Sequence, residues 1–242
     1  MNYTDFAQLL RKSALLNGIE PLDEEKTQQA YEFTTHLAEV NQVTNLTAIR
    51  NIEDMITKHL TDSLLASEYI PFGASVLDIG CGPGFPSIPL AIARPDLSIT
   101  ALDSTAKKIS FVNGAARKIG LTNLTAIAGR AEDDAISKKI GKVDIVVSRA
   151  VAKLVVLSEL CIPYVKIGGK LVALKASKAD EEVAEAERAI KILGGASAVL
   201  HKKSLYLSDD VAEPRCLIEI TKSKQTPAAY PRAYAAILKK PL

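Results

Sequence analysis

The chain has 242 residues, 48% of them hydrophobic and 24% charged, and its 30 basic and 28 acidic residues leave a formal charge of +2. This composition is typical of a globular protein with one large domain and a modest extension, and with so small a net charge any surface that binds nucleic acid has to be a local one. The three cysteines are dispersed and form no C-x-x-C pair, which predicts no disulfide framework and no metal site. No apolar run reaches the roughly 20 residues that span a membrane. We therefore expect a cytoplasmic monomer with no membrane partner.

Residues 1–70 are predicted to form an N-terminal helical extension that packs on a larger core. Apolar residues recur in it at spacings of three and four, which is typical of amphipathic helices. The stretches with this spacing are Phe6–Leu10, Ala30–Val40 and Ile56–Leu64. Pro21 followed by Asp23 predicts a break and then a helix N-cap, and a polar loop is expected over residues 41–51.

From residue 71 to residue 222, short β-rich runs alternate with helical patterns. Five of these runs are Ser75–Ile79, Ser98–Leu102, Leu124–Ala128, Val143–Ser148 and Lys170–Lys175. The alternation predicts an α/β fold, with a Rossmann-like, doubly wound and mostly parallel sheet covered by helices on both faces. Two further runs, Ala198–Tyr206 and Arg215–Thr221, would complete seven strands as a hairpin with an antiparallel last strand. Residues 223–242 form a basic C-terminal tail.

The first predicted strand leads into a turn in which glycines alternate at Gly80, Gly82 and Gly84. Such spacing lets the backbone turn tightly and lets a ligand approach it, which indicates a nucleotide-type cofactor at the carboxyl end of a parallel strand. A dinucleotide site usually reads G-x-G-x-x-G. Here Phe85 takes the place of the third glycine and Asp78 precedes the first. The alternative is a turn with a structural role alone.

The next two strand ends carry further polar residues. Asp103 directly follows the second run and could accept both hydrogen bonds of a ribose diol, unless it serves only to cap a helix. Ala131 and Glu132 follow the third run, where backbone and side-chain groups could meet an adenine edge. Together with the missing third glycine, this order of elements favours S-adenosylmethionine over a nicotinamide cofactor.

Motifs along almost the whole chain resemble those of the ribosomal RNA small subunit methyltransferase G family, also called glucose-inhibited division protein B. They are Asn41-x-x-x-Asn45-Leu46-Thr47, His59-x-x-Asp62-Ser63, Asp78-x-Gly80-x-Gly82-Pro83-Gly84-Phe85-Pro86, Leu102-Asp103-Ser104, Gly129-Arg130-Ala131-Glu132, Ser148-Arg149-Ala150 and Leu174-Lys175. Tyr230-Pro231-Arg232 and Lys239-Lys240-Pro241-Leu242 are also similar to the family's tail. Between them, residues 233–238 lack the Gly-x-Pro type of turn that the resemblance leads us to expect.

The resemblance implies an enzyme that methylates N7 of a specific guanosine in 16S ribosomal RNA, either as naked RNA or within the small ribosomal subunit. It implies S-adenosylmethionine as the methyl donor and S-adenosylhomocysteine as the product. By motif match and position in the turn, the implied cofactor-binding residues are Asp78, Gly80, Gly82, Phe85, Asp103, Ala131, Glu132 and Arg149. The guanosine and its N7 atom follow from the resemblance alone.

Guanine N7 carries a free lone pair, so its methylation removes no proton from the nucleophile. We therefore expect in-line methyl transfer in which the enzyme positions the reactants, with no catalytic residue acting as a general base.

The candidates for positioning the substrate are Arg149, Asn45, His59 and Lys175. Arg149 ends the fourth strand and could hold the guanine edge through its fork of donors, or could pair with a carboxylate such as Asp78. Asn45 could contact the base or be an ordinary turn residue. His59 could act with Asp62 on the substrate side, or the two could form a packing contact. Lys175 could reach a phosphate or a carboxylate.

Three clusters of basic residues are candidate contacts to the phosphates of the RNA. Residues 222–242 contain five basic residues and no acids, interleaved with Tyr230 and Tyr234. Lys107 and its neighbours follow Asp103, and residues 201–203 form the third cluster. Basic residues among aromatic ones suit phosphate contact and base stacking, although any one cluster could simply be solvated surface.

Other functions remain open at this point. The same cofactor motifs would serve a methyltransferase that acts on a protein or a small molecule, because the fold does not choose the acceptor. A non-catalytic RNA-binding or assembly protein could retain an adenosine pocket. A nicotinamide-dependent dehydrogenase is disfavoured by Asp78 and by the missing third glycine.

Overall fold

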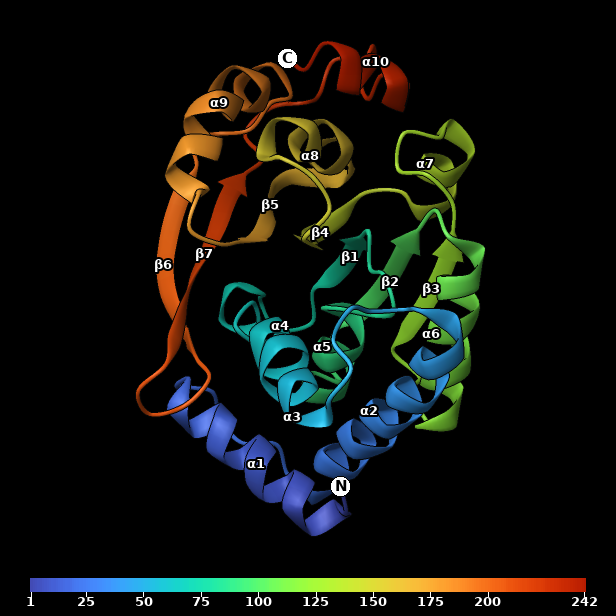
Figure 1. Ribbon diagram of the computed structural model, residues 1–242. Helices are drawn as coiled ribbons and strands as arrows, with labels where there is room; N and C mark the ends of the chain where they lie inside the picture. Colours follow the sequence, from blue (N-terminus) through green and yellow to red (C-terminus); the bar gives the residue numbers. More distant parts are fainter.

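Seven strands form a single sheet with helices on both of its faces, as Figure 1 shows for a computed structural model that describes all 242 residues. The strands are β1 (Ser75–Ile79), β2 (Ser98–Asp103), β3 (Leu124–Ala128), β4 (Val143–Arg149), β5 (Val165–Lys175), β6 (Val199–Tyr206) and β7 (Ala212–Thr221). Their order across the sheet is β3-β2-β1-β4-β5-β7-β6. Neighbours from β3 to β5 pair in parallel, whereas β7 is antiparallel to both β5 and β6. The predicted doubly wound, mostly parallel sheet with an antiparallel last strand is confirmed.

The helices fill the connections between the strands and build the N-terminal part of the chain. They are α1 (Tyr3–Leu16), α2 (Glu24–Thr44), α3 (Ile52–Met55), α4 (Asp62–Leu64), α5 (Ser87–Ala93), α6 (Ala106–Lys118), α7 (Asp134–Ile140), α8 (Leu154–Cys161), α9 (Ala179–Ile192) and α10 (Tyr234–Lys239). A π-helical turn, Ile56–Thr61, joins α3 to α4, and short 3-10 turns lie at Ser67–Tyr69 and Ile162–Tyr164. None of these helices is long and apolar enough to cross a bilayer.

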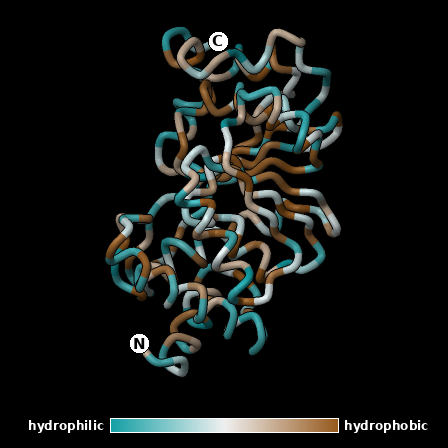
Figure 2. Tube along the Cα trace, turned by 90° about the vertical axis from the view of Figure 1, so that its right-hand side faces the viewer, coloured by the Kyte–Doolittle hydropathy of each residue, from teal (hydrophilic) through white to brown (hydrophobic).

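The sheet separates two hydrophobic clusters. The first joins it to α1, α2, α5 and α6, and the second joins it to α8, α9 and α10. Successive strand residues enter opposite clusters, Val76 the first and Leu77 the second, because side chains alternate across a sheet. Figure 2 shows the strands as hydrophobic segments, drawn in brown, in the interior of the molecule. The carboxyl ends of the parallel strands thus lie at a fixed edge between two packed layers.

The N-terminal helices share the first cluster with the sheet, since Phe33 of α2 packs against Phe85 and Phe111. The Asp23 carboxylate accepts a hydrogen bond from the Lys26 backbone at 2.9 Å, so the predicted N-cap is confirmed. The loop expected from residue 41 begins later, at Asn45. There the backbone takes the left-handed conformation (φ 49°) and ends α2.

Strand β5 is longer than the run over Lys170–Lys175 predicts, since it begins at Val165. Its first half does not alternate: Lys166, Ile167 and Gly168 are all exposed, and the pairing with β4 shifts register between Val143 and Ile145. At Gly169 a Cβ atom would lie 2.3 Å from the Asp144 carbonyl oxygen, so only glycine fits this close approach. Such an irregular strand carries no period-2 signal in the sequence.

Candidate functional site

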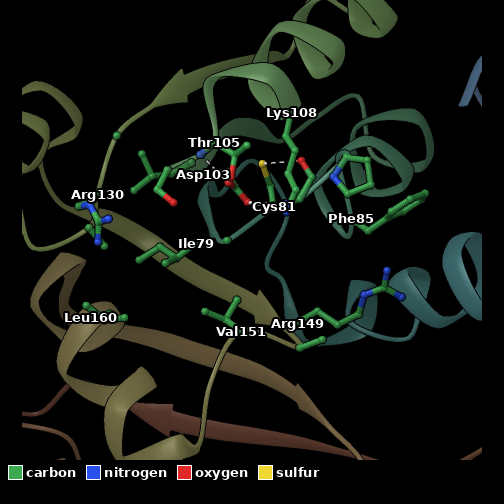
Figure 3. Close-up of a pocket in the computed structure, with 18 of the residues that line it drawn as sticks. Ile79, Cys81, Phe85, Asp103, Thr105, Lys108, Arg130, Arg149, Val151 and Leu160 are labelled. Carbon is green, nitrogen blue, oxygen red and sulfur yellow. Dashed lines mark hydrogen bonds and ion pairs between the residues drawn. The ribbon is translucent and has the colours of Figure 1, made fainter. Parts of the chain in front are cut away.

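A cavity of about 540 Å³ opens at the carboxyl ends of β1, β2, β3 and β4. This is where ligands bind in open α/β sheets, and the volume is in the ordinary range for small-molecule sites. Figure 3 shows Arg130 and Leu160 at one end of the cavity and Phe85 and Arg149 at the other, with Asp103 between them. Of the residues predicted to bind a cofactor, those that line it are Gly80, Gly82, Phe85, Asp103, Ala131, Glu132 and Arg149.

The turn after β1 needs glycine for two different reasons. The Gly80 amide donates to the Leu102 carbonyl at 2.7 Å and so ties the turn to β2, and a Cβ atom on Gly80 would lie 2.3 Å from Val151. Gly82 has a left-handed backbone (φ 55°), and a Cβ atom there would project into open space. The turn therefore presents bare backbone to the cavity, and a ligand can approach it closely.

Asp78, which was predicted to bind the cofactor, does not line the cavity. Its side chain is fully buried, and one carboxylate oxygen accepts a hydrogen bond from the Ser87 amide at 3.1 Å, at the start of α5. The other oxygen has no hydrogen-bond partner. Burial raises the pKa of Asp78 from its usual 3.8 to about 7. The residue thus joins the end of β1 to the next helix from beneath the glycine turn.

The Asp103 side chain lines the cavity and also fixes the backbone on either side of it. One carboxylate oxygen accepts from the Gly82 amide at 3.0 Å, and the other accepts from the Thr105 amide at 2.8 Å, just before α6. The Lys108 ammonium lies 4.0 Å away and supplies an opposite charge. Each carboxylate oxygen can accept more than one hydrogen bond, so the side chain can fix the turn and still accept from a ligand.

Arg149 reaches across from β4 to the helical segment that precedes β1. Its guanidinium donates to the Asp62 carboxylate and to the Lys58 carbonyl, each at 2.9 Å, and its carbon lies 5.3 Å from the centre of the Phe85 ring. The carboxylate that pairs with Arg149 is therefore Asp62 and not Asp78. Asp62 also accepts from Arg215 of β7 at 2.8 Å. Because two arginines share this buried carboxylate, Arg149 is held firmly at the wall of the cavity.

His59 occupies the same end of the cavity and stacks on Phe85, with ring centres 4.2 Å apart. Its Nδ1 lies 3.1 Å from a guanidinium nitrogen of Arg149, and its Nε2 lies 2.8 Å from the Thr47 hydroxyl. Burial, and then the nearby charge of Arg149, lower the pKa of His59 from its usual 6.5 to about 3. At neutral pH the imidazole is uncharged, so Nδ1 accepts from Arg149 and Nε2 donates to Thr47.

Two of the predicted substrate-side residues do not reach the cavity. Asn45 is exposed and ends α2, while its neighbours Leu46 and Thr47 line the cavity instead. Lys175 pairs with Glu182 of α9 at 2.7 Å and also donates to the Ala152 carbonyl. The motif of Asn45 contains the lining residues Leu46 and Thr47, whereas neither Leu174 nor Lys175 lines the cavity. The sequence does not show which residue of a motif faces inward.

The structure adds lining residues that sequence reasoning did not select. They include Thr47, Val151, Leu160 and Tyr234. The signal for Thr47 was present in the motif around Asn45. Tyr234 is 102 positions after Glu132 in the sequence, and only the path of the C-terminal tail brings it to the cavity.

Several of the predicted RNA-contacting basic residues already have acidic or buried partners. In β6, Lys202 pairs with Asp180 at 3.0 Å and Lys203 with Glu68 at 2.6 Å. Just before the tail, the Lys222 side chain is buried and donates to the Ile162 carbonyl, and within the tail Arg232 pairs with a carboxylate of α8. The clusters around residues 201–203 and in the tail are therefore less basic than the sequence suggests.

Comparisons with known proteins agree on one family. A family model described as GidB, rRNA small subunit methyltransferase G, matches residues 26–206. The ribosomal RNA small subunit methyltransferase G of Clostridium beijerinckii is 41% identical over 240 residues, which are 98% of this chain and 99% of that protein. The protein of the same name from Desulforamulus reducens is 45% identical over 224 residues, 91% of this chain and 92% of that protein.

Solved structures with a similar fold are more distant in sequence. A precorrin-6y C5,15-methyltransferase from Geobacter metallireducens has a TM-score of 0.52 and 17% identity, covering 75% of this chain and 92% of its own. NSun6 from Pyrococcus horikoshii has a TM-score of 0.54 and 14% identity, covering 69% of this chain and 53% of its own. At such identities the likeness concerns the fold alone.

Proposed function

The chain belongs to the rRNA small subunit methyltransferase G family, and from this premise we propose that it transfers the methyl group of S-adenosylmethionine to N7 of a specific guanosine in 16S ribosomal RNA, leaving S-adenosylhomocysteine. The observation that carries the proposal is a single cavity with two chemically different ends. Ala131 and Glu132 suit a nucleoside at one end, with Asp103 beside them towards the middle of the cavity, and Arg149 and Thr47 suit a guanine edge at the other end.

The residues at the strand ends fit S-adenosylmethionine. The backbone at Gly82 is open to the cavity, Asp103 offers carboxylate oxygens to a ribose diol, and Ala131 and Leu160 provide apolar contact for a purine. When bound, S-adenosylmethionine supplies a methyl group attached to a positively charged sulfur. The task of the protein is then to hold the guanine in line with that methyl group, with N7 free of hydrogen bonds.

Arg149 can recognise the guanine through O6, the acceptor next to N7. Two of its five N–H groups donate to Asp62 and Lys58, and a third donates to His59. The two remaining N–H groups have no partner within the protein. A guanidinium fixed by three bonds can therefore present donors to O6 with little loss of side-chain freedom.

Thr47 is a second candidate donor to the base. Its hydroxyl oxygen accepts from the Ile49 amide at 3.2 Å and, because the imidazole of His59 is uncharged, also accepts from Nε2 at 2.8 Å. With both acceptor positions used, the proton of the hydroxyl is free to donate into the cavity that Thr47 lines. In this proposal His59 is a positioning residue, which orients Thr47 and Arg149 and takes no proton from the substrate.

Methyl transfer to small ribosomal subunits from cells without this protein tests the proposal. The purified chain is incubated with S-adenosylmethionine carrying a labelled methyl group, and the modified nucleotide is mapped by mass spectrometry. We expect N7-methylguanosine at one position of the 16S RNA. Label in a protein or small-molecule fraction would overturn the choice of acceptor. Binding of S-adenosylhomocysteine without any transfer would favour a non-catalytic RNA-binding protein.

A further inference from the structure

The C-terminal tail forms a short helix where the family resemblance leads us to expect a Gly-x-Pro turn. This helix, α10, spans Tyr234–Lys239 and packs against α8, as Figure 1 shows near the C-terminus. Ile237 is fully buried in the second hydrophobic cluster, and Tyr234 and Leu242 pack against that cluster. The departure from the expected turn thus gives the tail a definite, packed conformation.

A buried ion pair fixes the tail just before this helix. Glu159 of α8 is fully buried, and its carboxylate accepts from the backbone amide of Arg232 at 2.9 Å and from the guanidinium at 2.8 and 2.6 Å. Charge-assisted bonds of this length are among the stronger contacts in proteins. Arg232 therefore holds the start of α10, two residues later, in one place.

Tyr234 lines the cavity as a result, and it does so at the nucleoside end. The guanidinium carbon of Arg130 lies 6.0 Å from the centre of the Tyr234 ring, and Figure 3 shows Arg130 and Leu160 together at that end. The hydroxyl of Tyr234 makes no hydrogen bond within the protein. What the residue offers the cavity is the aromatic ring, next to the apolar surface of Ala131 and Leu160.

We propose that Tyr234 is a cofactor-binding residue of this chain, whose ring contacts the adenine of S-adenosylmethionine and closes that end of the cavity. The inference rests on the proposed function, since it takes S-adenosylmethionine as the ligand. An aromatic ring beside a purine gains from stacking because every base has a π-face. The tail, which the sequence marked as an RNA contact, therefore also builds the cofactor site.

A tryptophan at this position can report the contact directly, because the natural chain has no Trp. Tyr234→Trp is titrated with S-adenosylhomocysteine, and emission is followed beside calorimetry of the same sample. We expect a saturable change of emission whose midpoint matches the calorimetric Kd. The matched control is Leu238→Trp, on the same helix and 53% exposed, which should show no change on titration.

Removal of the ring should weaken binding of the same ligand. Tyr234→Ala should bind S-adenosylhomocysteine about tenfold to a hundredfold more weakly, the range of a lost base–aromatic stack, whereas Tyr234→Phe should keep the wild-type Kd within about twofold. Urea unfolding of each variant checks that it is folded. Wild-type affinity in a folded Tyr234→Ala variant, or an unresponsive Trp at 234, would overturn the inference and leave the proposed function standing. Failure of the wild-type chain to bind S-adenosylhomocysteine at all would overturn both.

Discussion

Substitution of the buried carboxyl beneath the glycine turn, Asp78→Asn, should change the way in which stability depends on pH. Asp78 is fully buried and bonded to the Ser87 amide, and burial raises its pKa from 3.8 to about 7. Between these two pH values the folded chain keeps a proton on Asp78 that the unfolded chain has released. Stability from this group is therefore fully present below about pH 4 and is lost as pH rises towards 7.

The size of the effect follows from the two pKa values of Asp78. A shift from 3.8 to about 7 corresponds to about 4 kcal/mol of stability lost over the whole window. Asparagine has nearly the same shape and no charge at any of these pH values. The free energy of unfolding of Asp78→Asn, measured relative to wild type, should therefore rise by up to about 4 kcal/mol between pH 4 and pH 8.

Urea unfolding of the ligand-free protein at several pH values, followed by circular dichroism, measures this difference. Asp209→Asn provides the control, since it makes the same substitution at an exposed carboxylate, which pairs with Lys12 at the surface. His59 also titrates differently in the folded and unfolded chains, but it is present in every protein compared and cancels in the difference. A gap between Asp78→Asn and wild type that stays constant from pH 4 to pH 8 would refute the reasoning.

Three further predictions concern the cavity and the tail. Thr47→Val should lower kcat/KM for the RNA about tenfold, through the loss of one hydrogen bond, and leave the Kd for S-adenosylhomocysteine unchanged. Thr47→Ser, which keeps the hydroxyl, should retain most of the activity. A wild-type rate for the valine variant would show that Thr47 does not contact the substrate. Asp103→Asn should weaken S-adenosylhomocysteine binding about tenfold to a hundredfold by calorimetry, since it removes a charged acceptor, and equal affinity would show that no ribose hydroxyl reaches Asp103. Arg232→Met leaves the carboxylate of Glu159 buried without its charged partner, so the free energy of unfolding should fall by about 3–5 kcal/mol. If the tail detaches instead, a protease should cleave it rapidly. The absence of both effects would contradict the anchoring role of Arg232.

The fold could be predicted from the sequence largely because strand and helix signals are local. The runs at Ser75–Ile79 and Leu124–Ala128 match β1 and β3 residue for residue, since each is a short apolar stretch bounded by turn residues. The first half of β5 was missed because Gly168 and Gly169 interrupt it. Its pairing there depends on a close approach to Asp144 of the neighbouring strand, which no local pattern records.

The residues of the cavity could likewise be predicted only in part from the sequence. Residues at or just after the end of a strand, such as Gly80, Asp103 and Ala131, could be placed because the carboxyl ends of parallel strands meet at one edge. That rule does not separate Asn45 from its neighbours Leu46 and Thr47, and it places Lys175 at the same edge, although Lys175 does not line the cavity. In a motif of adjacent residues, the one that faces the cavity is decided by a helix end or by an ion pair with another element.

Charge is the property that the sequence describes least well in this chain. Lys222 and Arg232 were counted as part of a basic tail, yet the first is buried against the Ile162 carbonyl and the second neutralises Glu159 of α8. A basic residue is a good candidate for RNA contact when folding leaves its charge exposed and without an acidic partner. The tail's lysines without an acidic partner, Lys224, Lys239 and Lys240, therefore remain its candidate RNA contacts, while Arg232 serves to hold Tyr234 at the cavity. In this reading the tail has two separable roles. A chain with these three lysines replaced by serine should lose RNA affinity and salt dependence yet keep its affinity for S-adenosylhomocysteine, and a parallel loss of both affinities would contradict the separation.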